Sequence, residues 1–272
     1  MLETMEDLAN LLETDNFEIK YHIFYIPKRD GTLREIAAPS EELKRIQRII
    51  LEKILSCYSV HPKAQGFCSE KSILTNAQIH GNARIIINID IKDFFPTITF
   101  PRILGVFRKK FPQNIAFLLA CLCSLRGRLP QGACTSPALT NIICNNLDKR
   151  LNGFARSEDL IYTRYADDIT FSSNREINFS RFFYYVTKII KQEGFTLKRE
   201  KTKILRKNRR QEITGLGINE GYPTISRKWL HKLRAIIHNK ETKKRDIPER
   251  ILKGMLSFVK MISQEKYERM RV

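Results

Sequence analysis

The chain has 272 residues, of which 42% are hydrophobic, enough to bury one substantial core with small appendages. Lys and Arg number 48 against 29 Asp and Glu, which gives a formal net charge of +19. Because like charges repel in a compact fold, this excess favours a surface kept for a polyanion such as nucleic acid over the alternative of a solvated basic protein. More than half of the excess lies between Lys191 and Arg250, where contacts with phosphates would make binding strongly salt-dependent.

The composition also argues against zinc-binding and membrane-spanning proteins. The six cysteines form no paired Cys-x-x-Cys pattern, and no histidine cluster completes a zinc site. The residues from Met1 to Asn10 are acidic and amphipathic, unlike a signal peptide, and the apolar runs are too short to cross a bilayer. We therefore expect a cytoplasmic protein with free thiols and no membrane partner.

The first half of the chain is predicted to be mostly helical, with one hairpin and one buried strand. Residues 1–20 favour one or two short amphipathic helices. A hairpin is expected from Tyr21 to Pro39, where Asp30-Gly31 between apolar stretches is a turn signal. The run from Arg84 to Asp90 is typical of a buried strand that ends in a carboxylate. Helices are predicted over residues 41–58, 101–110 and 114–125.

The second half alternates short strands with helices. A loop rich in Pro and Gly, Leu129 to Gly132, leads into a helix over 136–153. Short strands over 160–164 and 169–172 flank a tight turn at Tyr165 to Asp168. The remaining elements are a helix over 179–193, an extended segment that starts at Phe195, a glycine-rich hairpin within 211–225, and two or three basic helices.

From Arg84 onward the order is strand, helix, hairpin, helix, strand. This split βαβ order predicts an α+β fold, in which helices cover one face of an antiparallel sheet. In that topology the end of the first strand lies beside the central hairpin. Asp90 and the pair Asp167-Asp168 are therefore expected to converge, although they lie far apart in the sequence.

Three converging carboxylates suit phosphoryl transfer. That reaction needs one Mg²⁺ to acidify the attacking hydroxyl and a second to hold the triphosphate and steady the leaving oxygen. Mg²⁺ prefers oxygen ligands and keeps several waters, so two or three carboxylates are enough. Because unpaired acids repel one another, an acidic group inside a chain of charge +19 is informative.

The alternative is that the Asp pair only caps backbone N–H groups in a turn, as Asp pairs often do. Here the pair is flanked by strand-like residues and preceded by Tyr165-Ala166. A second acidic motif, Asp90-Ile91-Lys92-Asp93-Phe94-Phe95-Pro96, accompanies it. The two motifs together favour a metal site.

Several motifs resemble those of reverse transcriptases, in the same order and at similar spacing over residues 21–225. Tyr165-Ala166-Asp167-Asp168 is similar to the Y-x-D-D signature, and the Asp90 motif resembles the first catalytic motif. Leu129-Pro130-Gln131-Gly132 resembles the LPQG motif, and Gly194-Phe195 through Lys201-Thr202 the lysine-bearing motif that follows. The resemblance implies a right-hand polymerase fold. Its expected parts are fingers (1–83 with part of 97–135), a ferredoxin-like palm (84–210), and a primer-grip-like hairpin with a short, basic helical thumb (211–272).

The resemblance also implies roles for individual residues. Asp90, Asp167 and Asp168 correspond to the metal-binding aspartates, with the Ile91 carbonyl as an additional metal ligand. Two Mg²⁺ ions are expected, with Mn²⁺ as a substitute. Lys201 corresponds to a lysine proposed to protonate the leaving pyrophosphate.

For the dNTP, the resemblance implies that Phe95 closes over the sugar and excludes ribonucleotides. The alternatives are that Phe95 belongs to the core or that Phe94 has this role. Gln131 and Gly132 match the segment that lines the dNTP and template pocket. Lys28 and Arg34 in the hairpin are expected to hold the triphosphate, the alternative being two solvated turn charges.

Two shorter motifs resemble those of bacterial retron reverse transcriptases. Asn76-Ala77-Gln78-Ile79-His80 is similar to their NAxxH element, and Ile213-Thr214-Gly215 to their VTG triplet, with Ile in place of Val. Asn76, His80, Ile213, Thr214 and Gly215 are accordingly expected to serve RNA binding, although a lone Asn or His is more often a satisfied polar group. The resemblance implies a structured non-coding RNA partner, a branched RNA–DNA product (msDNA), a role in antiphage defence and a separately encoded effector protein.

Two other interpretations remain open from the sequence. The chain could be another bacterial reverse transcriptase, of a group II intron-like or non-retron defence type. It could also be a non-catalytic RNA-binding scaffold that keeps a polymerase fold. The intact aspartates argue against the scaffold, because a protein that only binds RNA has no reason to concentrate unpaired acids.

Overall fold

The computed structural model describes residues 3–15, 18–28, 31–242 and 248–270. At its centre is a four-stranded sheet formed by β3 (Ile85–Asp90), β4 (Ile161–Tyr165), β5 (Asp168–Ser173) and β6 (Lys203–Arg206). The strand order is β4-β5-β3-β6, and every neighbouring pair is antiparallel. The split βαβ order predicted from the sequence is therefore confirmed. The last strand begins later than predicted, because a 3-10 turn at Arg199–Lys201 separates it from Phe195.

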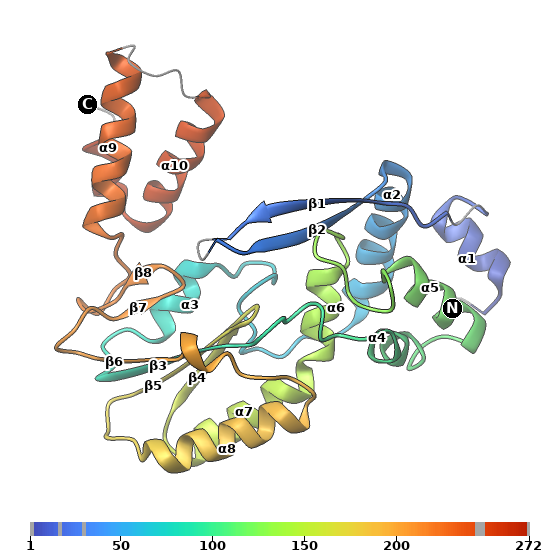
Figure 1. The fold of residues 1–272 in the computed structure, drawn as a ribbon, viewed down its shortest axis with the longest axis horizontal. Coiled ribbons are helices and arrows are strands. Elements are labelled where there is room, and N and C mark those ends of the chain that lie inside the picture. Colours follow the sequence, from blue (N-terminus) through green and yellow to red (C-terminus); the bar gives the residue numbers. More distant parts are fainter. Residues whose placement is uncertain (1–2, 16–17, 29–30, 243–247, 271–272) are drawn as a thin grey trace.

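Two long helices, α7 (Asn145–Ser157) and α8 (Phe179–Gln192), cover one face of this sheet (Figure 1). Successive strand residues point to opposite faces of a sheet. Ile85, Ile87 and Ile89 therefore all point to the face that the helices cover, which makes the contact apolar. The predicted helix over 136–153 is in fact two helices, α6 (Ser136–Ile143) and α7, which meet at Cys144. The Thr140 hydroxyl donates to the Ser136 carbonyl just before the break, a contact that bends helices.

The opposite face of the sheet is covered only in part. α3 (Ile73–Ile79) and the small hairpin of β7 (Glu212–Ile213) and β8 (Leu216–Gly217) pack over its start, around the buried Ile86. Farther along β3 the same face presents Asn88 and Asp90, which lie outside the apolar cluster that the described residues form there. The sequence places polar residues where this face is open.

The N-terminal part forms the other side of that opening. One helix, α1 (Met5–Leu12), precedes the paired strands β1 (Tyr21–Pro27) and β2 (Leu33–Pro39). The predicted hairpin is confirmed, although Asp30 of its turn lies outside the described residues. The helix α2 (Glu41–Ile49) follows and continues through a π-helical and a 3-10 turn to Cys57. Two helices from after β3, α4 (Phe100–Phe107) and α5 (Gln113–Leu122), lie on the same side, where α5 contacts α1 and α4 contacts α5.

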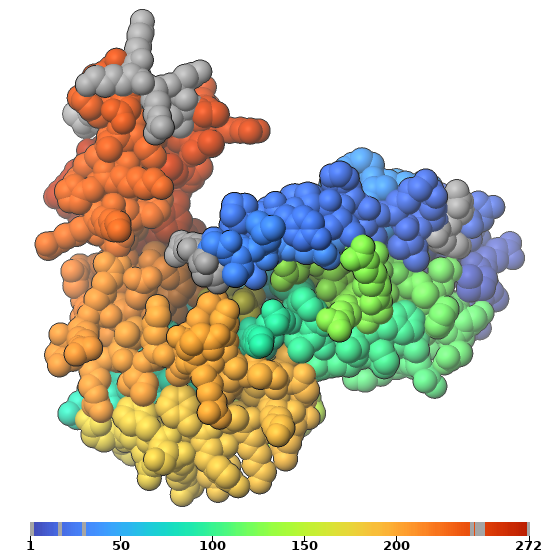
Figure 2. Space-filling model, in the orientation of Figure 1, coloured from blue at the N-terminus to red at the C-terminus, as the bar shows by residue number. Residues whose placement is uncertain are grey.

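The C-terminal part is a separate helical layer made of α9 (Arg227–Glu241), α10 (Glu249–Ile262) and α11 (Gln264–Glu268). It has a small core of its own around Leu233 and Val259. Figure 1 shows α9 and α10 rising beside the β1–β2 hairpin, and Figure 2 shows a notch between these helices and the two strands. Within the described part of the chain, no helix has the length and apolar character needed to cross a membrane.

Candidate active site

Three aspartates meet where the sheet opens. Asp90 is the last residue of β3, and its Cα is paired with that of Asp168, the first residue of β5. Asp168 also pairs with Tyr165 and so closes the β4–β5 hairpin, which places Asp167 in the turn. The Ile91 amide donates to the Asp167 carbonyl at 3.1 Å and ties the turn to the end of β3. The antiparallel register thus brings together two motifs that are distant in the sequence.

Burial and neighbouring carboxylates raise the pKa values of two of these aspartates. Although Asp168 exposes much of its surface to the cleft, the surrounding protein displaces water from the carboxylate. The pKa of Asp168 is raised to about 6, first by this desolvation and then by the carboxylates of Asp167 and Asp90. Desolvation and Asp90 raise the pKa of Asp167 as well. A cation placed here would relieve the repulsion.

A cation of the chain itself already contacts Asp90. The ammonium of Lys201 lies 3.0 Å from Asp90 Oδ2 and donates a hydrogen bond to it. This bond raises the pKa of Lys201, so the side chain is held in its charged form. The side chain of Lys201 remains half exposed.

The donor set fits a divalent cation, because carboxylate oxygens are the ligands that Mg²⁺ prefers. The backbone register pairs Asp90 with Asp168, and the charges of Asp167 and Asp90 contribute to the raised pKa of Asp168. The side chains are not arranged as a closed metal cage, since the described residues include no ready group of three or more His, Cys, Asp or Glu ligands. Asp90 is instead turned toward Lys201.

Two cavities meet at the aspartates. The first, which we name the nucleotide-side cavity after the role proposed for it below, has a volume of about 760 Å³ and is lined by Asp167, Phe95 and Gln131 among others. The second, the hairpin-side cavity, has a volume of about 1030 Å³ and is lined by Asp168, Thr214 and Gly215 among others. Four residues line both cavities: Lys28, Arg34, Asp90 and Lys201.

The two candidate gate phenylalanines differ in their packing. Phe94 also lines the nucleotide-side cavity, but it is buried and lies against Phe195, with ring centroids 5.6 Å apart. Phe95 is half-buried and faces Phe67 across 6.3 Å, at the wall of the nucleotide-side cavity. Phe95 is therefore the ring that presents more surface to a bound molecule.

The loop from Leu129 to Gly132 is fixed against the β1–β2 hairpin. The Ala37 amide donates to the Gln131 carbonyl at 2.7 Å. Gly132 has a φ of +132°, and a Cβ at this position would lie only 2.4 Å from the Ala37 carbonyl oxygen. Gln131 lines the nucleotide-side cavity, whereas Gly132 allows the close approach that places Gln131 there.

Sequence reasoning missed three cations of the nucleotide-side cavity, Arg126, Arg128 and Lys198. Arg126 and Arg128 belong to a tight turn in which Leu125 and Arg128 exchange backbone hydrogen bonds, and Arg126 lies 3.9 Å from Glu35. The signal that could have revealed them is the run Arg126-Gly127-Arg128 directly before the LPQG motif.

The five residues expected to serve RNA binding fall into two groups. Thr214 and Gly215 line the hairpin-side cavity, and Ile213 is buried behind them. Asn76 and His80 are buried in α3 and at its end. The ring nitrogens of His80 bind the hydroxyls of Ser172 and Thr163, each at 2.7 Å. The side chain of His80 therefore supports the sheet rather than reaching the surface.

Comparison with known proteins relates the chain to polymerases. A family model described as "Reverse transcriptase (RNA-dependent DNA polymerase)" matches residues 26–219. The retron Ec86 reverse transcriptase of Escherichia coli is 36% identical over 98% of this chain and 83% of its own length. The retron Mx162 and Mx65 reverse transcriptases of Myxococcus xanthus are 34% and 36% identical over 97% and 92% of this chain. The chain spans only 65% and 63% of the lengths of these two relatives.

Solved structures agree on the fold. A telomerase from Candida albicans superposes with a TM-score of 0.52 at 12% identity, over 80% of this chain and 50% of that one. A foamy viral protease–reverse transcriptase superposes with a TM-score of 0.51 at 16% identity, over 89% and 36%. The fold is the right-hand polymerase fold predicted from the sequence. The chain belongs to the reverse transcriptase (RNA-dependent DNA polymerase) family and, within it, to the retron reverse transcriptases.

Proposed function

We propose that this chain is an RNA-directed DNA polymerase that copies part of a structured non-coding RNA into a branched RNA–DNA hybrid, the msDNA of retrons. The observation that carries the proposal is the pairing of Asp90 with Asp168 at the point where two cavities meet. A polymerase needs this arrangement because the incoming nucleotide and the growing end must approach the same acids from two sides. The retron relatives support the choice of product.

The nucleotide-side cavity is the proposed dNTP site. Lys28 and Arg34 lie at its border with the second cavity, where they would bind the triphosphate oxygens by charge-assisted hydrogen bonds. Phe95 would contact the sugar and leave no room for a 2′-hydroxyl, and Gln131 would position the base and sugar from the LPQG loop. The hairpin-side cavity would then hold the primer end and its template.

The residues proposed to hold Mg²⁺ are Asp90, Asp167 and Asp168, with the Ile91 carbonyl as a further ligand and Mn²⁺ as a substitute. Two such ions, when bound, lower the pKa of the attacking hydroxyl and stabilise charge on the leaving phosphate. Lys201 leaves Asp90 in this proposal, and its ammonium donates a proton to the leaving pyrophosphate from Nζ. The side chain is exposed enough for this movement.

The cognate RNA would contact the hairpin formed by Ile213, Thr214 and Gly215 and the basic helices after it. Asn76 and His80 would act indirectly, because α3 supports this hairpin: the Thr214 hydroxyl donates to the Ile73 carbonyl at 3.4 Å. Structured RNA is read largely through its shape, phosphates and 2′-hydroxyls, which suits clustered Lys and Arg. The proposed parts remain fingers (1–83 with part of 97–135), palm (84–210), and hairpin with thumb (211–272).

Family membership supports the remaining elements of the proposal: a cytoplasmic role in antiphage defence and a separately encoded effector protein. Their test is genetic. Deletion of the gene should sensitise its host to phage, and the Asp168→Asn allele should fail to restore protection. Restoration by the Asp168→Asn allele would contradict a defence role that requires DNA synthesis.

Two experiments test the enzymatic proposal. Purified protein should incorporate dNTPs on a primed RNA template in the presence of Mg²⁺, and the Asp168→Asn variant should not. A lack of incorporation by the wild-type protein across a range of salt concentrations would favour a non-catalytic RNA-binding scaffold. Sequencing of nucleic acid that copurifies with the protein should reveal a 2′,5′-branched RNA–DNA species. Linear cDNA in its place would favour a reverse transcriptase of another type.

A further inference from the structure

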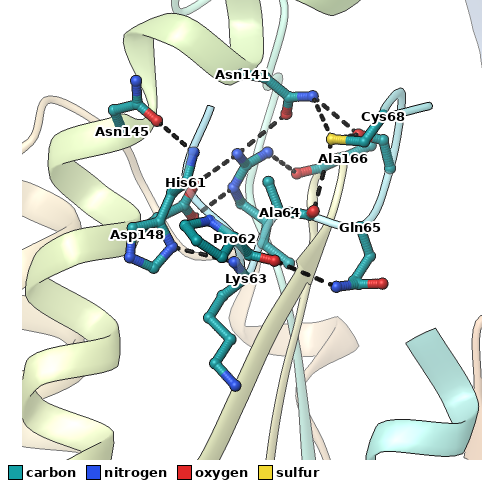
Figure 3. Close-up of polar contacts among 12 residues, drawn as sticks. His61, Pro62, Lys63, Ala64, Gln65, Cys68, Asn141, Asn145, Asp148 and Ala166 are labelled. Carbon is teal, nitrogen blue, oxygen red and sulfur yellow. Dashed lines mark hydrogen bonds and ion pairs between the residues drawn. The ribbon is translucent and has the colours of Figure 1, made fainter. Parts of the chain in front are cut away.

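A cation is buried in β4 directly before the catalytic turn. Arg164 is fully buried, and its guanidinium makes a two-pronged ion pair with Asp148 of α7, with Nε to Oδ1 and Nη2 to Oδ2 both at 2.7 Å. Nη2 also donates to the Asn141 side chain, and Nη1 donates to the Ala166 carbonyl, each at 3.1 Å (Figure 3). A single side chain therefore links α6, α7 and the turn.

Stability alone does not account for such a group. Taking two charges out of water is costly, and well-packed apolar residues of similar volume often stabilise a core as well or better. An apolar side chain cannot reproduce the planar set of N–H donors of a guanidinium, which fixes the positions of the acceptor groups around it. One of those donors is used on the backbone of the catalytic turn.

The turn needs external support. Ala166 has a φ of +57°, in the left-handed region that an L-residue with a side chain rarely adopts. Backbone strain of this kind persists only when the surroundings enforce it. Arg164 holds the Ala166 carbonyl on one side, and Gly66 lies against the turn, where a Cβ would come within 2.6 Å of the Ala166 nitrogen.

The two supports are joined to each other and to the body of the protein. The Asn141 side chain accepts from Arg164 and donates to the Gly66 carbonyl at 2.9 Å. The Tyr162 hydroxyl donates to Asp148 at 2.6 Å. The Arg164 backbone pairs with the segment before Gly66, with its amide donating to the Lys63 carbonyl at 3.0 Å. The turn is thus fixed by a closed hydrogen-bonded frame, part of which appears in Figure 3.

We propose that Arg164 is a positioning residue for the metal-binding aspartates: by holding the Ala166 carbonyl it sets where Asp167 and Asp168 lie relative to Asp90. This inference rests on the proposed polymerase function. Its consequence is kinetic, because a misplacement of about 1 Å at a reacting group costs on the order of 100-fold in rate. Arg164 itself touches neither substrate nor metal, since it is fully buried.

The first test is Arg164→Lys, which keeps the positive charge but removes the planar set of guanidinium N–H donors. We expect kcat for primed-template extension to fall 10- to 100-fold, the KM for dNTP to stay within twofold, and Mn²⁺ binding measured by electron paramagnetic resonance to weaken at least fivefold. The matched control is Phe182→Leu, a buried change in α8 on the covered face of the sheet. It should lower Tm without changing Mn²⁺ affinity.

Two further variants separate positioning from folding. Gly66→Ala presses on the turn without removing a polar group and should reproduce the loss of kcat and of Mn²⁺ affinity. The triple variant Arg164→Met, Asp148→Leu and Tyr162→Phe replaces the buried polar group with apolar volume. A folded triple variant with wild-type Mn²⁺ affinity would show that the group is only structural, and so would wild-type behaviour of both Arg164→Lys and Gly66→Ala.

The measurements also distinguish the inference from the proposed function. If the wild-type protein binds Mn²⁺ but extends no primer, the polymerase proposal fails, while the Mn²⁺ affinities of the variants still decide the role of Arg164. If the wild-type protein extends primers and the variants match it in both kcat and Mn²⁺ affinity, the inference alone is overturned.

Discussion

The ammonium of Lys201 lies 3.0 Å from Asp90 Oδ2, so an internal cation contacts the carboxylate that is proposed to bind metal. The bond joins the segment before β6 to the end of β3. It also means that a metal ion must compete with Lys201 for Asp90, and this competition can be measured.

Lys201→Ala is expected to strengthen Mn²⁺ binding while slowing the reaction. An ion pair with one half-exposed partner contributes at most about 1 kcal/mol, so removal of the competitor should lower the Kd for Mn²⁺ by up to about fivefold. Loss of a proton donor should lower the single-turnover rate by about 100-fold or more. Lys203→Ala is the control, since Lys203 lines the hairpin-side cavity and makes no ion pair with Asp90. An unchanged Mn²⁺ affinity in Lys201→Ala would show that the two cations do not compete.

Asp168→Asn should abolish incorporation and yet stabilise the metal-free protein at neutral pH. The folded pKa of Asp168 is raised to about 6 from 3.8, so its contribution to stability is fully present below pH 3.8 and is lost as pH rises through 6. At pH 7.5 the uncharged Asn removes this penalty, and Tm should rise by about 2 °C, given the solvent screening at the cleft. Thermal unfolding without and with Mg²⁺ measures both effects.

The control for this prediction is Asp93→Asn, which removes an acid from the nucleotide-side cavity but outside the paired aspartates. It should leave the Mg²⁺-dependent rise in Tm intact, whereas Asp168→Asn should reduce it. A lower Tm for metal-free Asp168→Asn at pH 7.5 would contradict the electrostatic account of this site.

Phe95→Val should relax discrimination against ribonucleotides. Phe95 presents its ring to the nucleotide-side cavity, so a smaller side chain makes room for a 2′-hydroxyl. We expect the ratio of kcat/KM for dNTP over rNTP to fall by about 10- to 100-fold, which corresponds to about 1–3 kcal/mol of lost discrimination. Phe94→Leu is the matched comparison: Phe94 lines the same cavity but is buried against Phe195, so its change should lower stability without changing the ratio. The reverse result would assign the gate to Phe94.

His80 should control the acid stability of the sheet. Burial lowers the pKa of His80 to about 3, so the unfolded chain takes up a proton at His80 at a higher pH than the folded one. The stability that this histidine contributes is present above pH 6.5 and is lost as pH falls toward 3. Between pH 6.5 and pH 4 the stability difference between wild type and His80→Gln should shrink by about 3 kcal/mol.

Urea unfolding at several pH values measures this change, and His22→Gln at the exposed surface of β1 serves as the control. A difference between wild type and His80→Gln that does not vary with pH would mean that burial does not hold His80 in its neutral form.

The sequence by itself determined the strand order and the meeting of the aspartates. Side chains alternate along a strand and a two-residue turn fixes the register of a hairpin, so a strand ending at Asp90 and a hairpin turning before Asp168 leave little freedom in the split βαβ topology. These rules depend on residues that lie close together in the sequence, so they can be applied without knowing where distant segments pack. The prediction of a single helix over 136–153 was wrong, because the spacing of apolar residues does not reveal the break at Cys144.

Only the tertiary structure decided which side chains face the cavities and which are buried. Phe94 and Phe95 are neighbours in the chain and both line the nucleotide-side cavity, but Phe94 is the more buried because Phe195 packs against it. His80 and Arg164 are both polar and both buried, because hydroxyls and a carboxylate from other elements satisfy them. Such partners lie far away along the chain, and the cost or gain of burying a polar group depends entirely on whether they are present.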